Sequence, residues 1–440
     1  PFMLCEFIHS MGNGPGDAED YMQCIYSNDR FLGGLVWEWC DHAIDMGKTL
    51  DGRKKYYYGG DFKEFPHDGN FCVDGMVAPD RTPHPALLEY KNVIRPVRAR
   101  LLNAATGVVE LENKLDFTDL MDYLSIQAEL LCQGEVIRRY PVCHASIAPH
   151  QKGLITIDFA KDVDPASGSS YHLNLTYISR ENRGLVEAGS VLGFDQLLIK
   201  AADLSIAAVT GADGTVFGIH TDTAINDTAS KIDADTAVTS APASVCETRT
   251  AILVTAPDYH YEFNKLTGTF DCITVNQIPR MVKPLEFNIW RAPADNDRNI
   301  ANAWRQAGYD RIMTRVYETK VSSELGRTTI HCNMAIHAIQ IQHILDIDAA
   351  WMIHGDGSLD VKIHAIRNTE LPFLPRFGLR LFLPEEYRQV SYLGYGPYES
   401  YIDKHQASSF GRFTDTVDNM YVDYIKPQEH GSRFGCESVT

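Results

Sequence analysis

The chain has 440 residues, of which 44% are hydrophobic and 22% are charged. This balance is typical of a folded globular protein, and the length predicts two or three domains. The net charge of −18 at pH 7 argues against nucleic acid or an anionic membrane as the main partner. No apolar run approaches the length of a membrane span, and no charged stretch precedes an apolar one at the start. We therefore expect neither a membrane span nor a signal peptide.

Ten cysteines are spread along the chain, without a C-x-x-C pair and without zinc-finger spacing to histidine. Several of them, such as Cys5 and Cys40, lie in apolar runs. This pattern favours free, buried thiols in a reducing compartment. We expect the protein to be cytoplasmic.

Residues 1–90 alternate between strand and helix patterns. The apolar runs at 2–7 and 31–39 are typical of buried strands, and residues 17–28 have a helical apolar face with Asp17 as a cap. A strand, a helix and a strand at this spacing predict a parallel sheet. The predicted helical face consists of Ala18, Tyr21, Met22, Ile25 and Tyr26.

A long loop is predicted over residues 48–82, which are rich in Gly, Pro, Asp and aromatic residues. Loops of this length inside a compact domain usually have a function. A helix at 83–92 closes the segment. The strand predicted at 2–7 resembles one strand of a barrel, and a single barrel strand cannot fold by itself. We therefore expect the chain to be the C-terminal part of a larger enzyme.

Beyond Pro96 the pattern changes to apolar residues at every second position, which predicts an antiparallel β-sandwich up to about residue 195. Strands continue from about residue 200, with one helix at 300–308. The segment 221–248 has low complexity and reads equally as a loop or as structure. The later strands are expected at residues 205–216, 251–254, 259–265, 359–366 and 377–382.

Glu6 follows a short apolar run, His9 comes three residues later, and a glycine-rich turn follows. A carboxylate at the carboxyl end of a barrel strand is where such an enzyme performs its chemistry. A retaining glycosidase needs one carboxylate as nucleophile and a second, about 5–5.5 Å away, as acid and base. On spacing alone, a solvated strand end with a surface histidine is the commoner explanation of this pair.

The turn Gly12-x-Gly14-x-Gly16 offers an alternative, a dinucleotide site with Glu38 about twenty residues on. The glycine spacing does not fit, and Pro15 lacks an N–H for a phosphate. A tight turn with positive φ at glycine explains the pattern better than a dinucleotide site does.

Trp37 and Trp39 end the second strand, where an indole could bind the C–H face of a sugar. Because strand residues alternate between faces, at least one of the two should be a core residue. In the loop at 67–75, oxygen donors gather as a hard cation such as Na⁺ or Mg²⁺ would require. Taken by itself, this loop is more commonly an ordinary Asp/Asn/Gly turn.

Together these segments resemble glycoside hydrolase family 2, and within it the large, LacZ-type β-galactosidases. Six motifs in the family's order carry the resemblance, and two of them lie outside the barrel. They are LCEFIHSMGNGPG (4–16), GGLVWEW (33–39), YGGDF (58–62), NFCVDGMVAPDRTPHPALLE (70–89), RAPADNDR (291–298) and YLGYGPYESYID (392–403).

The resemblance implies a multidomain, mostly β fold. Residues 1–92 would be the end of a (β/α)₈ TIM barrel and 93–197 an immunoglobulin-like β-sandwich. Residues 198–440 would be most of a β-supersandwich of the galactose-mutarotase type, incomplete at its C-terminal end. The family's acid/base glutamate, its main Mg²⁺ ligands and its N-terminal domains would lie before residue 1.

The resemblance also implies roles for single residues. Glu6 would be the catalytic nucleophile, and His9 and Trp37 would contact galactose. The Phe71 carbonyl and the Asp74 carboxylate would hold Na⁺, with Asp74 where the best-known member has Asn and able to bind a sugar hydroxyl too. His67 matches a peripheral Mg²⁺ ligand, but imidazole is a poor partner for Mg²⁺.

The resemblance predicts a retaining β-galactosidase that hydrolyses terminal β-D-galactose from β-galactosides such as lactose. The expected cofactors are Mg²⁺ and Na⁺, and the expected partners are the missing N-terminal portion and further copies in a homo-oligomer. Two alternatives stay open. One is a related activity on glucuronides or mannosides, and the other is a non-catalytic, complementing carbohydrate-binding subunit.

Overall fold

The computed structural model describes residues 1–202, 217–219, 243–324 and 326–440. It divides into two compact units that are mostly β. The first unit holds residues 1–202, 294–296 and 389–439, and the second holds the other described residues. None of the helices in the described ranges has the length and apolar character that a membrane span requires.

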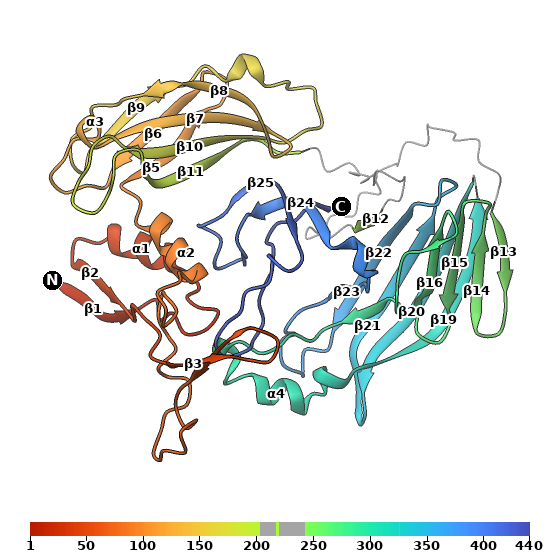
Figure 1. Ribbon diagram of the computed structural model, residues 1–440. Helices are drawn as coiled ribbons and strands as arrows, with labels where there is room; N and C mark the ends of the chain where they lie inside the picture. The colour runs from red at the N-terminus through yellow and green to blue at the C-terminus, as the bar shows by residue number, and fades with distance from the viewer. Residues whose placement is uncertain (203–216, 220–242, 325) are drawn as a thin grey trace. The chain divides into compact units, whose positions relative to one another are not determined.

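The chain begins with a strand, a helix and a strand. β1 (Phe2–Phe7) and β2 (Phe31–Val36) pair in parallel, with α1 (Ala18–Tyr26) between them in the chain (Figure 1). This confirms the predicted parallel pair, although β2 ends three residues earlier than expected. The predicted burial of both strands is wrong. In the described chain β1 pairs only with β2, so most of its side chains have a solvent-facing side.

The predicted face of α1 is right in part. Ala18 and Ile25 are buried, whereas the Tyr21 and Tyr26 side chains are exposed. Asp17 occupies the N-cap position, but its side chain makes no capping hydrogen bond. Its φ of 54° is left-handed, and its backbone N–H instead donates to the Asp403 carbonyl at 2.7 Å. The tertiary contact with Asp403 therefore decides how this helix begins.

The long predicted loop contains regular structure at its start. β3 (Ile44–Lys48) and β4 (Lys54–Tyr57) form an antiparallel hairpin, and irregular backbone follows up to α2 (Pro85–Val93). The predicted closing helix is thus confirmed, and Pro85 occupies its first turn as expected for a residue without an N–H.

Seven strands then enclose one core, as two antiparallel sheets. The sheet orders are β5-β6-β9 and β11-β10-β7-β8, and inward side chains of both sheets, such as Leu111 and Leu175, are fully buried. This confirms a β-sandwich after Pro96. Its elements are β5 (Val97–Asn103), β6 (Val108–Asn113), α3 (Leu120–Tyr123), β7 (Leu124–Cys132), β8 (Glu135–Cys143), β9 (Lys152–Thr156), β10 (Tyr171–Ser179) and β11 (Val191–Lys200).

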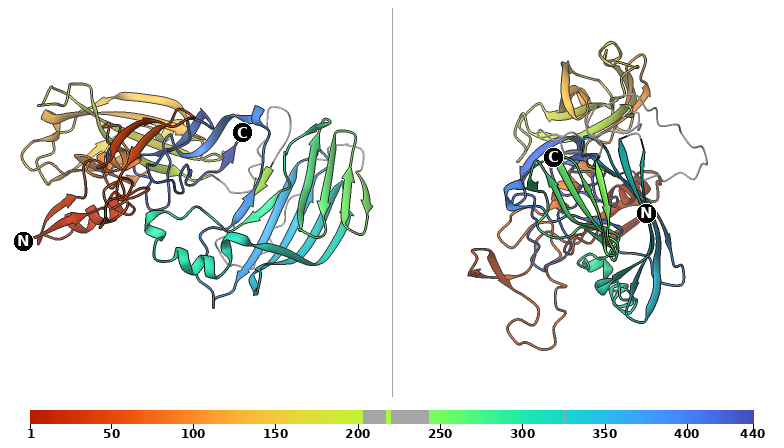
Figure 2. Two further views of the ribbon diagram at one scale, coloured as in Figure 1. Left: turned by 60° about the horizontal axis from the view of Figure 1, so that its bottom comes forward. Right: turned by 90° about the vertical axis from the view of Figure 1, so that its right-hand side faces the viewer.

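The last part of the chain returns to the first unit. Its three strands pair in the order β25-β24-β26, and the Phe410 backbone exchanges two hydrogen bonds with the Gln196 side chain on β11, at 2.6 and 2.8 Å. Figure 2 shows this blue segment beside the sandwich. The strands are β24 (Gln389–Gly396), β25 (Ser409–Thr416) and β26 (Ser438–Val439).

The second unit contains two five-stranded sheets whose buried faces share one large core. The sheet orders are β12-β22-β21-β20-β19 and β13-β14-β15-β16-β17, and the two sheets lie face to face (Figure 2). Their bounds are β12 (Phe217–Ile219), β13 (Ser244–Glu247), β14 (Ala251–Thr255), β15 (Tyr259–Asn264), β16 (Thr269–Val275), β17 (Ile278–Pro279), β19 (Met313–Glu324), β20 (Arg327–Ala338), β21 (Ile341–Ile353) and β22 (Leu359–Arg367).

A short antiparallel pair and one helix complete this unit: β18 (Glu286–Asn288), β23 (Gly378–Arg380) and α4 (Ala301–Gln306). The expected helix and four of the five expected later strands are confirmed, with ends that differ by a few residues. The three long strands β19, β20 and β21 were not predicted. The strand expected at 205–216 and most of the segment 221–248 lie outside the described residues.

All ten cysteines lie in the described part of the chain, and all are free thiols, as predicted. Their predicted burial is mostly wrong, because only Cys40 and Cys332 are buried and Cys5 is exposed. Cys5 lies on β1, whose side chains are largely open to solvent in this chain.

Candidate functional site

Glu6 lies near the carboxyl end of β1, the strand that pairs in parallel with β2. Backbone hydrogen bonds hold the ends of both strands together: the Trp37 N–H donates to the Phe7 carbonyl at 3.3 Å, and the Ser10 N–H to the Trp37 carbonyl at 2.8 Å. The Glu6 side chain is half-exposed, at 50%. The backbone at Glu6 is therefore held at a strand end, and its carboxylate is open to solvent.

His9 lies between two carboxylates. Its Nε2 is 3.5 Å from Glu6 Oε1 and 3.5 Å from Asp74 Oδ2, and its ring meets the Phe71 ring edge-on, with centroids 6.2 Å apart. The structure thus brings together four of the predicted site residues, from two segments more than sixty residues apart. The imidazole can orient both carboxylates or bridge them to a sugar hydroxyl.

Asp74 is the buried member of this group, with 2% exposure. Its Oδ1 is buried and has no hydrogen-bond partner, and a lone buried carboxylate oxygen is costly unless a cation or donor binds it. Burial and a hydrogen bond with Asp74 raise the pKa of Glu38. The donor set therefore fits a hard cation or a sugar hydroxyl at Asp74 Oδ1.

The loop that carries Asp74 is fixed by its backbone. The Glu38 N–H donates to the Asp74 carbonyl at 3.0 Å, and the Met76 N–H donates back to the Glu38 carbonyl at 2.9 Å. A Cβ on Gly75 would lie 2.3 Å from the Asp41 backbone nitrogen, so only glycine allows this approach.

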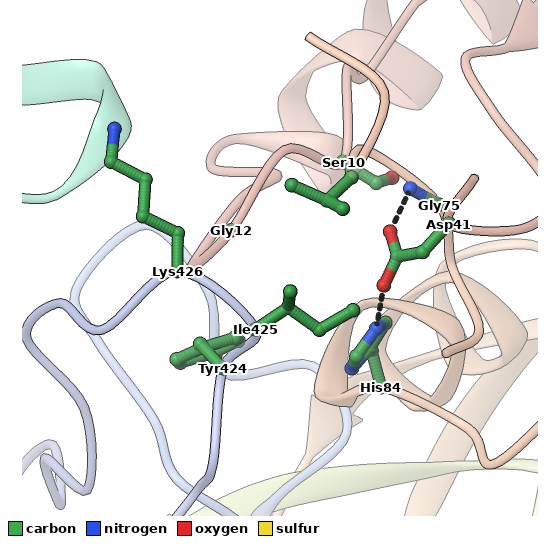
Figure 3. A pocket seen from close by; sticks show the side chains of 9 residues that line it. Ser10, Gly12, Asp41, Gly75, His84, Tyr424, Ile425 and Lys426 are labelled. Carbon is green, nitrogen blue, oxygen red and sulfur yellow. Dashed lines mark hydrogen bonds and ion pairs between the residues drawn. The ribbon is translucent and has the colours of Figure 1, made fainter. Parts of the chain in front are cut away.

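A pair of a buried Asp and a partly buried His supports the same loop, and the sequence did not reveal it. Asp41 Oδ1 accepts the Gly75 N–H at 2.8 Å, and Asp41 Oδ2 is 2.6 Å from His84 Nε2. The pair forms one wall of a small pocket that Ser10 and Tyr424 also line (Figure 3). Asp41 and His84 lie inside or beside the quoted motifs, but nothing in their spacing of 43 residues predicts that they meet.

The two tryptophans differ from the prediction. Trp37 is 43% exposed and Trp39 is 62% exposed, so neither is a core residue. β2 ends at Val36, and the strict alternation of faces ends with it. Trp37 stays available to contact a sugar.

His67 is exposed, its Nδ1 accepts the Gly69 N–H at 3.2 Å, and its ring lies against Gly60. Within the described ranges, no group of three or more His, Cys, Asp or Glu side chains is arranged as a metal site. The doubtful Mg²⁺ role of His67 stays a prediction.

The glycine turn is filled by the chain itself. A Cβ on Gly12 would lie 2.4 Å from Asp295 Oδ2, and one on Gly16 would lie 2.3 Å from Asp403 Oδ2. Gly12 also has a φ of +56°. Close approach and a left-handed backbone explain these glycines without a bound phosphate.

A buried hydrogen-bond network joins the glycine turn to the GYGPYESYID segment (394–403) and to Lys404, which follows it. Lys404 Nζ donates to the Asn13 carbonyl at 2.8 Å and to Asn13 Oδ1 at 2.6 Å, and lies 3.3 Å from Glu399 Oε1. Glu399 Oε2 also accepts the Gly431 N–H at 2.8 Å. The end of the chain thus anchors the turn that follows His9.

Comparison with known proteins gives three family matches in order along the chain. Residues 1–99 match the glycosyl hydrolases family 2 TIM barrel domain. Residues 109–200 match β-galactosidase domain 4, and residues 255–440 match the β-galactosidase small chain.

Curated relatives agree with these matches. A β-galactosidase of Actinobacillus pleuropneumoniae is 40% identical over 99% of this chain and 40% of its own length. One from Staphylococcus xylosus is 33% identical over 98% of this chain and 40% of its own length. One from Kluyveromyces lactis is 27% identical over 98% of this chain and 38% of its own length. The chain thus spans about two fifths of the length of these relatives.

Proposed function

Since the chain belongs to glycoside hydrolase family 2, we propose that it is the nucleophile-bearing part of a retaining β-galactosidase. The substrate class would be terminal, non-reducing β-D-galactosides such as lactose. One observation carries the proposal: Glu6 ends a parallel strand, 3.5 Å from an imidazole that also contacts the buried Asp74. A glycosidase nucleophile needs this position at a strand end, with polar side chains beside it.

In the proposed reaction, a Glu6 carboxylate oxygen attacks the anomeric carbon and forms a galactosyl ester. The glycosidic C–O bond breaks, and a glutamate outside this chain protonates the leaving oxygen. The same glutamate then removes a proton from water, which attacks the anomeric carbon and releases Glu6. His9 keeps the Glu6 carboxylate oriented and, with Trp37 and Asp74, binds the sugar.

The cation site is proposed at the Phe71 carbonyl and the Asp74 carboxylate, with Na⁺ as the ion. The buried, unpartnered Asp74 Oδ1 supports it. A bound cation would supply a fixed positive charge that orients a galactose hydroxyl. The main Mg²⁺ ligands are proposed to lie outside this chain.

The finer architecture is part of the proposal. Residues 1–92 are proposed as the end of a (β/α)₈ barrel, 93–197 as an immunoglobulin-like sandwich and 198–440 as a β-supersandwich. The strand–helix–strand start, the seven-stranded sandwich and the two facing five-stranded sheets support these assignments. A cytoplasmic location and a homo-oligomer stay predictions.

The remaining three fifths of the relatives' length suggests a partner for the β1–β2 surface. Phe2, Met3, Leu32 and Leu35 are 57%, 49%, 71% and 54% exposed there, and exposed apolar clusters mark interaction sites. We propose that the N-terminal portion of the enzyme covers them. The alternative, a non-catalytic complementing subunit, predicts that this chain never carries the covalent sugar.

Labelling with a 2-fluoro-galactoside, followed by mass spectrometry of the full-length protein, tests the nucleophile. The label should attach to Glu6. Glu6→Gln should lower turnover of nitrophenyl β-galactoside by at least about 10⁴-fold while galactose still binds. The control Glu181→Gln, at a carboxylate that is 73% exposed, should keep the wild-type rate.

A label on another residue, or near-wild-type turnover by Glu6→Gln, would remove the role from Glu6. Faster hydrolysis of the nitrophenyl glucuronide than of the galactoside would favour the related activity instead.

A further inference from the structure

One buried carboxylate that takes no part in the proposed reaction joins three segments of the site. Asp295 lies in the RAPADNDR motif, and its side chain is 6% exposed. Its Oδ1 accepts from Asn70 Nδ2 at 2.7 Å and from Lys426 Nζ at 2.6 Å. Its Oδ2 accepts from Gln428 Nε2 at 2.9 Å. Three side-chain donors therefore converge on one carboxylate.

The charge of Asp295 strengthens these contacts. Burial acts to raise the pKa of Asp295, but the hydrogen bonds from Lys426, Gln428 and Asn70 outweigh it and hold the pKa below its usual value. Hydrogen bonds to a charged acceptor are roughly twice as strong as neutral ones. Lys426 is 43% exposed, so solvent weakens its share. The hydrogen bonds from Asn70 and Gln428 thus hold the Asp295 carboxylate in place together with the ion pair.

On one side Asp295 holds the loop with the proposed cation ligands. Asn70 directly precedes Phe71, and its carbonyl accepts the Val73 N–H at 3.1 Å. A side chain that fixes Asn70 therefore fixes the start of the turn that presents the Phe71 carbonyl and Asp74.

On the other side Asp295 lies against the segment with Glu6 and His9. There is no room for a Cβ between Asp295 Oδ2 and Gly12, three residues after His9. Gln428 extends the contact, since its Oε1 accepts the Asn13 N–H at 3.0 Å and the Asp295 N–H at 3.3 Å.

We propose that Asp295 is a positioning residue: through Asn70 and the Gly12 turn it sets the separation between Glu6–His9 and Phe71–Asp74. The inference rests on the function proposed above. The alternative is that Asp295 only tethers its own loop, in which case its loss would lower stability and leave the site geometry unchanged.

The test uses the full-length protein with Asp295→Ala, Asn70→Ala and the conservative Asp295→Asn. Both alanine variants should lower kcat/KM for nitrophenyl β-galactoside by about a hundredfold, because a shift of about 1 Å costs that much. They should also weaken Na⁺ binding about tenfold, measured by ²³Na relaxation in a sodium chloride titration. Asp295→Asn, which can still accept from Asn70, should recover part of both losses.

The matched control is Asp310→Asn, which removes a carboxylate paired with Arg311 at 2.8 Å in a surface turn. It should change neither kcat/KM nor Na⁺ binding. Alanine variants with kcat/KM and Na⁺ affinity within twofold of wild type, and only a lower melting temperature, would overturn the proposal.

If Asp295→Ala fails to fold, Asn70→Ala decides, because Asn70 is only partly buried. Wild-type protein without a 2-fluoro-galactoside label at Glu6 would reject the proposed function and this inference together. A labelled wild type with unaffected variants would reject this inference alone.

Discussion

At the scale of single residues, Lys404 is a buried cation: its side chain is 3% exposed and its Nζ lies 3.3 Å from the fully buried Glu399 carboxylate. Burial lowers the pKa of Lys404, against the pull of Glu399. Lys404→Met would leave that carboxylate without its cation. We expect it to lower the free energy of unfolding by about 3–5 kcal/mol, measured by urea denaturation.

The control at this scale is Arg412→Met. Arg412 pairs with Glu135 at 3.4 Å, but the two side chains are 38% and 66% exposed, so the loss should stay below about 1 kcal/mol. The double variant Lys404→Met/Glu399→Gln should regain part of the stability. Equal losses for Lys404→Met and Arg412→Met would show that burial of the Lys404 pair does not matter.

Among the elements, β10 meets β25 through a stacked pair: the rings of His172 and Phe410 lie 4.8 Å apart. Burial lowers the pKa of His172 from 6.5 to about 4, and its Nδ1 has no partner. Between these two pH values His172 binds a proton in the unfolded chain but stays neutral in the folded chain. The free energy of unfolding should therefore fall by about 2 kcal/mol as the pH drops from 6.5 to 4, and this contribution should level off below pH 4.

His172→Phe keeps an aromatic ring at this contact and removes the titration. The difference between wild type and variant, from urea denaturation at each pH, isolates the contribution of His172. The control His331→Phe, at an exposed side chain on β20, should show no such difference between pH 6.5 and 4. A pH-independent difference for His172→Phe would contradict the prediction.

For the whole molecule, the exposed apolar side chains of β1 and β2 predict how the chain behaves by itself. Apolar clusters on a strand pair with unpaired edges promote association. We expect the isolated chain to form soluble aggregates in gel filtration. Leu32→Lys/Leu35→Lys, at two exposed positions, should shift it toward the monomer and weaken its pairing with the N-terminal portion.

Leu154→Lys/Leu198→Lys is the comparison, at two leucines of the sandwich that are 65% and 54% exposed. These substitutions should leave complementation by the N-terminal portion unchanged. A monodisperse wild-type chain, or unchanged complementation by the β2 variant, would argue against a covered β1–β2 surface.

Local pattern was enough to predict much of this protein. The apolar runs that form β1 and β2, the intervening helix, the sandwich after Pro96 and the free cysteines all follow from side-chain period and spacing. Glu6 and His9 were predicted as site residues from their place at a strand end, and their side chains lie 3.5 Å apart. The family motifs then indicated a glycoside hydrolase, because short motifs and their order can be read directly from the sequence.

Only the tertiary structure decided which distant groups meet. Asp295 contacts Asn70 across 225 residues, and Lys404 contacts Asn13 across 391. The end of β2 at Val36 exposes both tryptophans against the alternation rule. The reason is physical: periodicity reports which side of an element is apolar, whereas hydrogen-bond partners and burial depend on what another part of the chain places against it.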